Sequence, residues 1–284
     1  MNVRVCNVRG VSFASDFHES VTTTGFAVLT HHGIDHGLIR DTKAAWREFF
    51  TKPLAYKNDF ANVDNGNQGY KGMKTEKAVG AEVADLKEFY HWRPGKVLPP
   101  EAIASTTRIF SQLEDLGGLC LNLLDYANNF NTEYMESCEE SDNTILRTIY
   151  YPPIKDCNAE PGAVRSAAHE DINFITLLVA ASAPGLEVKD SFGGWHAVPH
   201  EENSIVVNIG DMLQLASKGK YKSTTHRVVN PSSGDGGDRI SMPLFIHPHS
   251  STLLADGFTA GQYLSERIAQ IYQTVKNEAQ TPVS

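Results

Sequence analysis

The sequence predicts a mainly β protein, in which an antiparallel core of two sheets follows a helical segment and precedes a closing helix. Three observations lead to this fold class. From residue 145 onward, short runs of β-branched and aromatic residues alternate with clusters of Gly, Pro, Asn, Asp and Ser, which is typical of a sandwich or barrel. The first 130 residues instead carry apolar side chains at helical spacing. A last run with that spacing covers about 260–276.

The N-terminal segment predicts one strand and two helices. GFAVLT (25–30) has the composition of a short strand. Apolar residues between Leu38 and Phe50 recur at helical intervals, and a proline shortly afterwards ends that helix. We expect a second helix over about 101–128. Residues 55–100 are expected to be irregular because Gly, Asn and Pro interrupt them, and the acidic stretch 132–142 is expected to be a solvated connection.

The predicted core consists of short strands separated by turn residues. These strands are ILRTIYY (145–151), FITLLVA (174–180), LEVKD (186–190), WHAVP (195–199), SIVVNIG (204–210) and RISMPLFIH (239–247).

Composition excludes several classes of function. The 284 residues contain 25 Lys and Arg against 34 Asp and Glu, and no basic stripe suggests a nucleic-acid or anionic-membrane surface. The N-terminus does not resemble a signal peptide, and no apolar run is long enough for a membrane helix. The four cysteines form no C-x-x-C pair, which suits a reducing compartment. We therefore expect a cytoplasmic protein without a membrane or nucleic-acid partner.

A histidine and an aspartate stand two residues apart where a strand is expected, in SAAHEDINFITLLVA. Alternate side chains of a strand share a face, so His169 and Asp171 should point the same way and Glu170 the other way. One imidazole and one carboxylate are two of the three ligands of a facial iron site, which needs a second imidazole. His226, in YKSTTHRVVNP, is the candidate.

A second pair follows on the last expected strand, where Arg239 and Ser241 share a face. A guanidinium fork beside a hydroxyl can hold a carboxylate by charge-assisted hydrogen bonds.

Taken singly, each of these motifs has an ordinary explanation. Any of the 11 histidines is more often a surface or hydrogen-bonded core residue, and H-x-D or R-x-S arises by chance. Their order and strand context together favour a mononuclear iron site.

Several segments resemble one enzyme family. GGWHAVPHEENSIVVNIGDMLQLASKGKYKSTTHRVVNP resembles the corresponding segment of the isopenicillin N synthase-like branch of the iron(II)- and 2-oxoglutarate-dependent oxygenases. GFAVLTHHGI, FFTKPLAYK, GYKG, DLKEFYHW and TAGQYLSERIAQI resemble further landmarks of that family. The resemblance implies a double-stranded β-helix (jelly-roll, cupin-like) core at 145–250. It also implies an N-terminal mixed or helical segment at 1–130, and a single oxygenase domain over 1–284.

Carried over residue by residue, the resemblance makes His169, Asp171 and His226 the iron ligands. Arg239 and Ser241 match the pair that binds the distal carboxylate of 2-oxoglutarate. Tyr151 matches a tyrosine that contacts the cosubstrate in several relatives. This chain has Ile149 where many plant members have asparagine, so Arg147 on the same face is either a replacement polar contact or a surface salt bridge.

The implied activity needs iron(II), 2-oxoglutarate and dioxygen, and releases succinate and carbon dioxide while oxidising, most simply hydroxylating, a small molecule. Two alternatives stay open: an oxidase or cyclase of the same fold that does not use 2-oxoglutarate, and a non-catalytic metal-binding sensor. The oligomeric state, a monomer or a weak dimer, also stays open. Candidate substrate-pocket residues come from the family landmarks and from strands near the metal. They are Gln68, Tyr70, Lys71, Glu88, Tyr90, Arg93, Phe174, Phe245 and His247.

Overall fold

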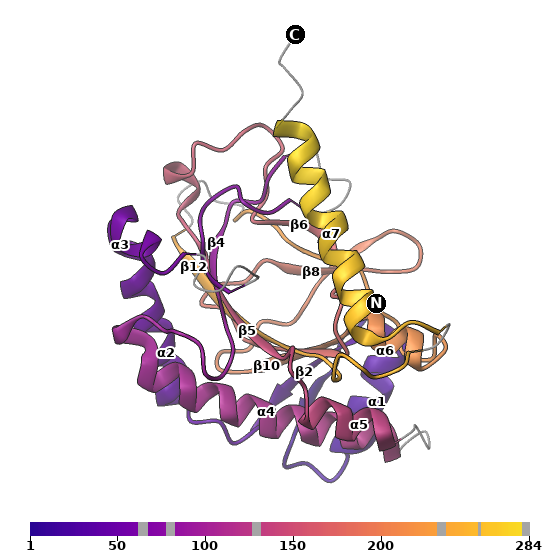
Figure 1. Cartoon of the computed structure of the whole chain (residues 1–284). Helices are drawn as coiled ribbons and strands as arrows, with labels where there is room; N and C mark the ends of the chain where they lie inside the picture. Colours follow the sequence, from indigo (N-terminus) through magenta and orange to yellow (C-terminus); the bar gives the residue numbers. More distant parts are fainter. Residues whose placement is uncertain (62–67, 78–82, 127–131, 232–236, 255–256, 280–284) are drawn as a thin grey trace.

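The computed structural model describes residues 1–61, 68–77, 83–126, 132–231, 237–254 and 257–279. Two sheets form a jelly-roll core with flanking helices (Figure 1). The larger sheet has eight strands in the order β1 (Val5–Asn7), β2 (Phe26–Thr30), β10 (Ile205–Ile209), β7 (Ile175–Val179), β12 (Arg239–Ile246), β5 (Ile145–Tyr151), β4 (Glu88–Trp92) and β3 (Gly69–Lys71). The smaller sheet has the order β6 (Ser166–His169), β11 (His226–Val228), β8 (Leu186–Lys189) and β9 (Trp195–Ala197).

Seven α-helices lie within the described residues. They are α1 (Phe13–Thr24), α2 (His36–Thr51), α3 (Leu54–Asn58), α4 (Ile103–Tyr126), α5 (Thr132–Glu139), α6 (Asp211–Ala216) and α7 (Ala260–Ala279). Short 3-10 turns at Pro100–Ala102 and Ile154–Asp156 complete the elements described. In these ranges, no helix combines the length and the apolar character that crossing a membrane requires.

Helix α2 shows why the local sequence folds as it does. The Asp35 carboxylate caps its first turn by accepting a hydrogen bond from the Gly37 amide at 2.8 Å. Apolar residues at helical spacing are buried on one face. Among them is Trp46, whose indole N–H donates to Thr106 of α4 at 2.9 Å and so satisfies the ring's one polar group. Helix α2 therefore packs on α4 as one layer beneath the larger sheet (Figure 1).

Helix α4 approaches the larger sheet closely because of one glycine. A Cβ atom at Gly117 would lie 2.2 Å from the Cδ1 atom of Ile246 on β12. A larger residue would require the Ile246 side chain or the helix to shift, because packed interiors leave no such space. The helical layer thus covers the outer face of this sheet, and α7 lies away from α2 and α4 (Figure 1).

Most of the predicted elements are confirmed, and two predictions are wrong. The segment 55–100 is not irregular throughout, because α3, β3 and β4 lie within it and β3 and β4 extend the larger sheet. The acidic stretch 132–142 contains α5 rather than only a solvated connection. Its Cys138 is buried and its Tyr134 ring packs against Phe174, so one face of this acidic helix is anchored to the core. The strand β1 and helix α1 had no counterpart in the prediction.

Candidate metal centre

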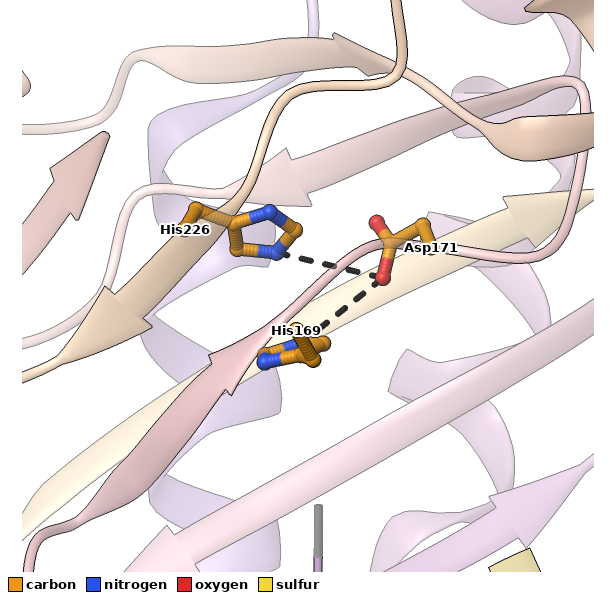
Figure 2. A group of neighbouring side chains, drawn as sticks. All are labelled: His169, Asp171 and His226. Atoms are coloured by element: carbon orange, nitrogen blue, oxygen red, sulfur yellow. Dashed lines mark ion pairs between the residues drawn. The ribbon is translucent and has the colours of Figure 1, made fainter. Parts of the chain in front are cut away.

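Two imidazoles and one carboxylate converge between β6 and β11 (Figure 2). His169 is the last residue of β6, and His226, the first residue of β11, is its partner in the antiparallel ladder. Asp171 follows just beyond the end of β6. Each imidazole Nε2 atom lies 3.9 Å from Asp171 Oδ1, and one ligand atom from each residue lies within 4.8 Å of the others. In the described part of the chain, no other group of three such residues could hold a metal ion.

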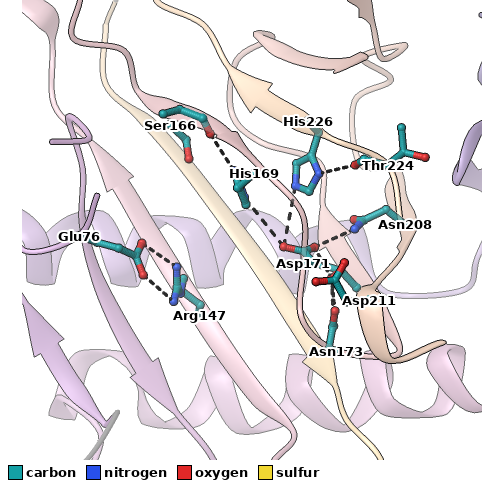
Figure 3. Close-up of polar contacts among 12 residues, drawn as sticks. Glu76, Arg147, Ser166, His169, Asp171, Asn173, Asn208, Asp211, Thr224 and His226 are labelled. Atoms are coloured by element: carbon teal, nitrogen blue, oxygen red, sulfur yellow. Dashed lines mark hydrogen bonds and ion pairs between the residues drawn. The ribbon is translucent and has the colours of Figure 1, made fainter. Parts of the chain in front are cut away.

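Hydrogen bonds orient all three side chains (Figure 3). The Nδ1–H of His169 donates to the Ala167 carbonyl at 2.8 Å, and that of His226 donates to the Thr224 carbonyl at 3.1 Å. Because a carbonyl only accepts, each neutral ring keeps its Nε2 lone pair free for a metal.

The Asp171 carboxylate is fixed in the same way (Figure 3). Its Oδ2 atom accepts hydrogen bonds from the Thr176 hydroxyl at 2.6 Å and from the Asn208 amide at 2.7 Å. The Oδ1 atom is left to face the two imidazoles. The Oδ2 atom thus holds the carboxylate in its orientation, while the Oδ1 atom remains available to bind a metal.

The electrostatics set the protonation states that a divalent metal requires. Burial, and then the neighbouring His226, lower the pKa of His169 to about 4, so its imidazole is neutral at neutral pH. Burial alone would raise the pKa of Asp171. The two imidazoles and the Thr176 and Asn208 hydrogen bonds outweigh it and hold that pKa below its ordinary value. A neutral imidazole beside an ionised carboxylate matches the donor set of a facial iron site.

Arg239 and Ser241 lie in the same cavity, which has a volume of about 240 Å³. Arg239 is 2% exposed, and its guanidinium lies 3.4 Å from the Ser241 hydroxyl and 5.0 Å from the ring centre of Tyr151. Within the described residues, Arg239 forms no ion pair with a carboxylate. A buried cation without a counter-ion is costly, so this end of the cavity is suited to an anionic ligand.

Arg147 is an ion-pair partner inside the cavity rather than at the surface. It contacts both carboxylate oxygens of Glu76, at 3.0 and 3.2 Å (Figure 3). Its Nε–H also donates to the Nε2 atom of His91. The guanidinium carbon also lies 4.5 Å from the ring centre of Phe89 and 5.4 Å from that of Phe245. Four neighbours therefore fix this side chain.

The same wall contains a charge network that sequence reasoning missed. Lys87 is 6% exposed and pairs with Glu76 at 2.7 Å and with Asp85 at 2.8 Å. Asp85 in turn accepts a hydrogen bond from the Ala167 amide of β6 at 2.9 Å. Burial alone would raise the pKa of Glu76, but Arg147 and Lys87 hold it well below its ordinary value. The segment DLKEFYHW carries ionisable residues on both of its alternating faces, so the sequence did not single out this one.

Only two of the nine predicted pocket residues, Phe245 and His247, line the cavity. The other seven predictions are wrong for this cavity: Gln68, Tyr70, Lys71, Glu88, Tyr90, Arg93 and Phe174. Glu88 and Tyr90 lie on the face of β4 that packs against the helices. Glu88 pairs with Lys57 at 2.7 Å, and the Tyr90 ring lies 5.0 Å from that of Trp46. Strand alternation thus excludes both from the cavity.

Glu170 is not one of the three converging residues. The Thr225 hydroxyl donates a hydrogen bond to its Oε1 atom, so Glu170 joins the strand ends of β6 and β11 next to His169 and His226.

A jelly roll with two histidines and one aspartate oriented toward a common point defines the class of mononuclear non-haem iron oxygenases. The family model described as the 2OG-Fe(II) oxygenase superfamily matches residues 142–248. The model described as the N-terminal region of the non-haem dioxygenase in morphine synthesis matches residues 8–106.

Individual proteins with similar sequences or structures support the same family assignment. The chain is 30% identical over 247 residues to the 2-oxoglutarate-dependent dioxygenase citB of Monascus ruber, covering 78% of this chain and 74% of that protein. It is 29% identical to the proline hydroxylase buaE of Petromyces alliaceus, covering 93% and 95%. A candidate oxygenase from Shewanella oneidensis superposes with a TM-score of 0.83 at 38% identity, covering 95% and 99%.

The chain therefore belongs to the iron(II)- and 2-oxoglutarate-dependent oxygenases, in the isopenicillin N synthase-like branch. Iron(II) and 2-oxoglutarate are the cofactor and cosubstrate of this class, and its activity is that of a dioxygenase acting on a small molecule.

Proposed function

We propose that His169, Asp171 and His226 bind iron(II), and that Arg239 and Ser241 bind the far carboxylate of 2-oxoglutarate. One observation carries this proposal. The cavity holds three oriented metal-ligand atoms, and along the same cavity a buried guanidinium lacks a carboxylate partner among the described residues. A ligand with a chelating group and a distant carboxylate would satisfy both requirements at once.

Iron(II) with bound 2-oxoglutarate supplies an oxidant from dioxygen, with release of succinate and carbon dioxide. The residues of this chain position the bound groups and exclude water from them. Thr176 and Asn208 fix the Asp171 carboxylate, so the ligand geometry is set before binding. Apolar side chains from Ile172, Leu264 and Ile268 line the cavity and keep water from the reacting atoms.

The reaction we propose is hydroxylation of a small molecule, as the name of the relative from Petromyces alliaceus suggests for that protein. Tyr151 lies beside Arg239, and we assign it to cosubstrate binding. Arg147 is held by Glu76, so we assign it to the substrate wall rather than to the cosubstrate. The acidic balance of the chain and its four free cysteines support action in the cytoplasm, without a nucleic-acid or membrane partner.

A second arrangement uses the same residues differently. Arg239 and Ser241 could bind the carboxylate of the substrate itself, as in relatives that do not use 2-oxoglutarate. Adding iron(II) and then 2-oxoglutarate to the full chain under anaerobic conditions distinguishes the two. We expect a new visible absorption band from the iron–2-oxo acid chelate, followed by succinate formation on admission of air. Iron binding without that band would refute the 2-oxoglutarate proposal, and absence of iron binding would refute the ligand assignment.

A further inference from the structure

The residue that follows β12, His247, offers a hydrogen-bond acceptor to the cavity. Its side chain is 6% exposed and lines the cavity that also holds the three metal-ligand residues. Its Nδ1–H donates to the Phe245 carbonyl at 3.2 Å, so the Nε2 atom carries the lone pair of the neutral ring. No residue in the described ranges donates a hydrogen bond to that Nε2 atom. A buried acceptor of this kind is satisfied by a ligand or by water.

The imidazole of His247 stays neutral in this setting. Burial chiefly, and Arg93 to a smaller extent, lower its pKa to about 4, although the hydrogen bond to the Phe245 carbonyl, Asp171 and Asp142 act in the opposite direction. At neutral pH the ring therefore accepts a hydrogen bond at Nε2 and carries no charge to attract an anion.

The charges on the neighbouring wall cancel one another. Arg147 and Lys87 pair with Glu76, and Lys87 also pairs with Asp85. His91 accepts from Arg147 and so directs its Nε2 atom toward that neighbour. This network of four charged residues therefore leaves no net charge to select an ionic substrate.

The rest of the cavity surface is largely apolar, although the ionisable side chains of Lys77, Glu170 and Arg267 also line it. Arg267 pairs with Asp211 at 3.3 Å, and Glu170 accepts a hydrogen bond from Thr225. Phe245 on β12 precedes His247, and Ile145, Ile172, Leu264 and Ile268 line the same cavity. A polar acceptor within apolar surroundings discriminates strongly for a ligand that donates a hydrogen bond, because a ligand without the donor leaves the acceptor desolvated and unpaired.

We propose that His247 determines the specificity of this enzyme for an uncharged, largely apolar substrate that donates one O–H or N–H to the Nε2 atom. The inference rests on the proposed function, since it assigns the substrate class of the same cavity. It is independent of which residue binds 2-oxoglutarate.

Phenol and anisole are suitable probes, because methylation removes the donor and changes little else. Binding of each probe to the full chain is measured by calorimetry, with zinc(II) and 2-oxoglutarate added so that no turnover occurs. We expect phenol to bind on the order of fivefold more tightly than anisole, the size of one net hydrogen bond. His247→Phe should abolish the difference. His247→Gln should retain part of it, because its amide oxygen can accept near the position of Nε2. His249→Phe, a substitution of a histidine that does not line the cavity, should leave it unchanged.

Nitrogen-15 chemical shifts of the labelled histidines test the same inference without any probe. They should show His247 as the neutral tautomer protonated at Nδ1. The other tautomer, equal binding of the two probes, or binding of neither probe would overturn the proposal. An intact preference for phenol together with no iron-dependent decarboxylation would refute the proposed function alone. Decarboxylation without that preference would refute only the role of His247.

Discussion

Two walls of one cavity differ in how their polar side chains are satisfied. What we call the first wall comprises the ends of β6 and β11 in the smaller sheet together with Arg239 of β12 in the larger sheet. Here the ligand atoms of His169, Asp171 and His226 face one another, and Arg239 has no carboxylate partner in the described residues. On the wall formed by β4 and β5, Arg147 and its partners Glu76 and Lys87 satisfy one another. Polar side chains that have no partner within the protein are available to bind a ligand. Polar side chains that already pair with one another instead stabilise the wall of the cavity. Substitutions on the first wall should therefore change binding, and those on the second should change stability.

The largest effect is expected from His226→Ala. It removes one of three ligand atoms and leaves two, so metal binding should fall from near one equivalent to near none, and turnover should be lost with it. Metal content after dialysis against iron(II) measures the change. His249→Ala, which removes a histidine outside the cavity, should bind metal like the unaltered chain. Undiminished binding by His226→Ala would contradict the assignment of the triad.

Arg239→Lys should have the next largest effect. Lysine keeps the positive charge but loses the planar fork, so the concentration of 2-oxoglutarate needed for half-maximal turnover should rise about tenfold or more. Metal binding should not change, because Arg239 is not a ligand. Arg40→Lys, at a side chain that is 75% exposed, is the matched control. An unchanged requirement would indicate that Arg239 binds the carboxylate of the substrate instead.

The sequence predicted the first wall much better than the second. In H-x-D and in R-x-S, two polar residues stand two positions apart, so they share one face of a strand. Such polar residues are easy to recognise in the sequence because the rest of the strand is apolar. The prediction extended the strand through Asp171, whereas β6 ends at His169. The two side chains still converge, because the hydrogen bonds of the carboxylate fix its direction.

The second wall was assigned to the wrong face of β4. This strand is buried on both sides and carries ionisable residues on both, with Glu88 toward the helices and His91 toward the cavity. Polarity alone therefore could not distinguish the faces. Glu88 pairs with Lys57, and Lys87 pairs with Glu76 as well as with nearby Asp85. Lys57 and Glu76 lie in other segments of the chain, so only tertiary structure reveals these two pairs. Glu76 lies before β4 in a stretch without a periodic pattern, so no local signal placed it in the cavity.

Glu76→Gln tests whether the second wall serves stability. It leaves Arg147, whose side chain is 17% exposed, without its carboxylate counter-ion, which should lower the free energy of unfolding by about 2–3 kcal/mol at neutral pH. Binding of metal and of 2-oxoglutarate should not change. Urea unfolding measures the effect. Glu48→Gln, which breaks the exposed pair with Lys52, should cause no measurable change.

The pH dependence of the same variant sharpens this test. The folded-state pKa of Glu76 lies below its ordinary value of 4.5, so its carboxylate contributes stability above that pH. That contribution is lost as the pH falls below about 4.5 toward the folded-state pKa. The stability difference between the unaltered chain and Glu76→Gln should therefore be largest near neutral pH and shrink in acid. A difference that stays constant across this range would show that the carboxylate charge does not matter.

The smallest effect is expected at Glu170, which stands between two residues of the triad without belonging to it. It accepts a hydrogen bond from Thr225, the residue before His226. Glutamine also offers an acceptor oxygen, so Glu170→Gln should retain metal, keep most 2-oxoglutarate decarboxylation and lose less than about 1 kcal/mol of stability.

Asp171→Asn is the variant to compare with Glu170→Gln. It is nearly isosteric but removes the negative charge that complements a divalent metal, so it should lose metal and activity together. If Glu170→Gln were the inactive variant and Asp171→Asn the active one, Glu170 rather than Asp171 would be the carboxylate ligand. The contrast between the two walls would then need a different explanation.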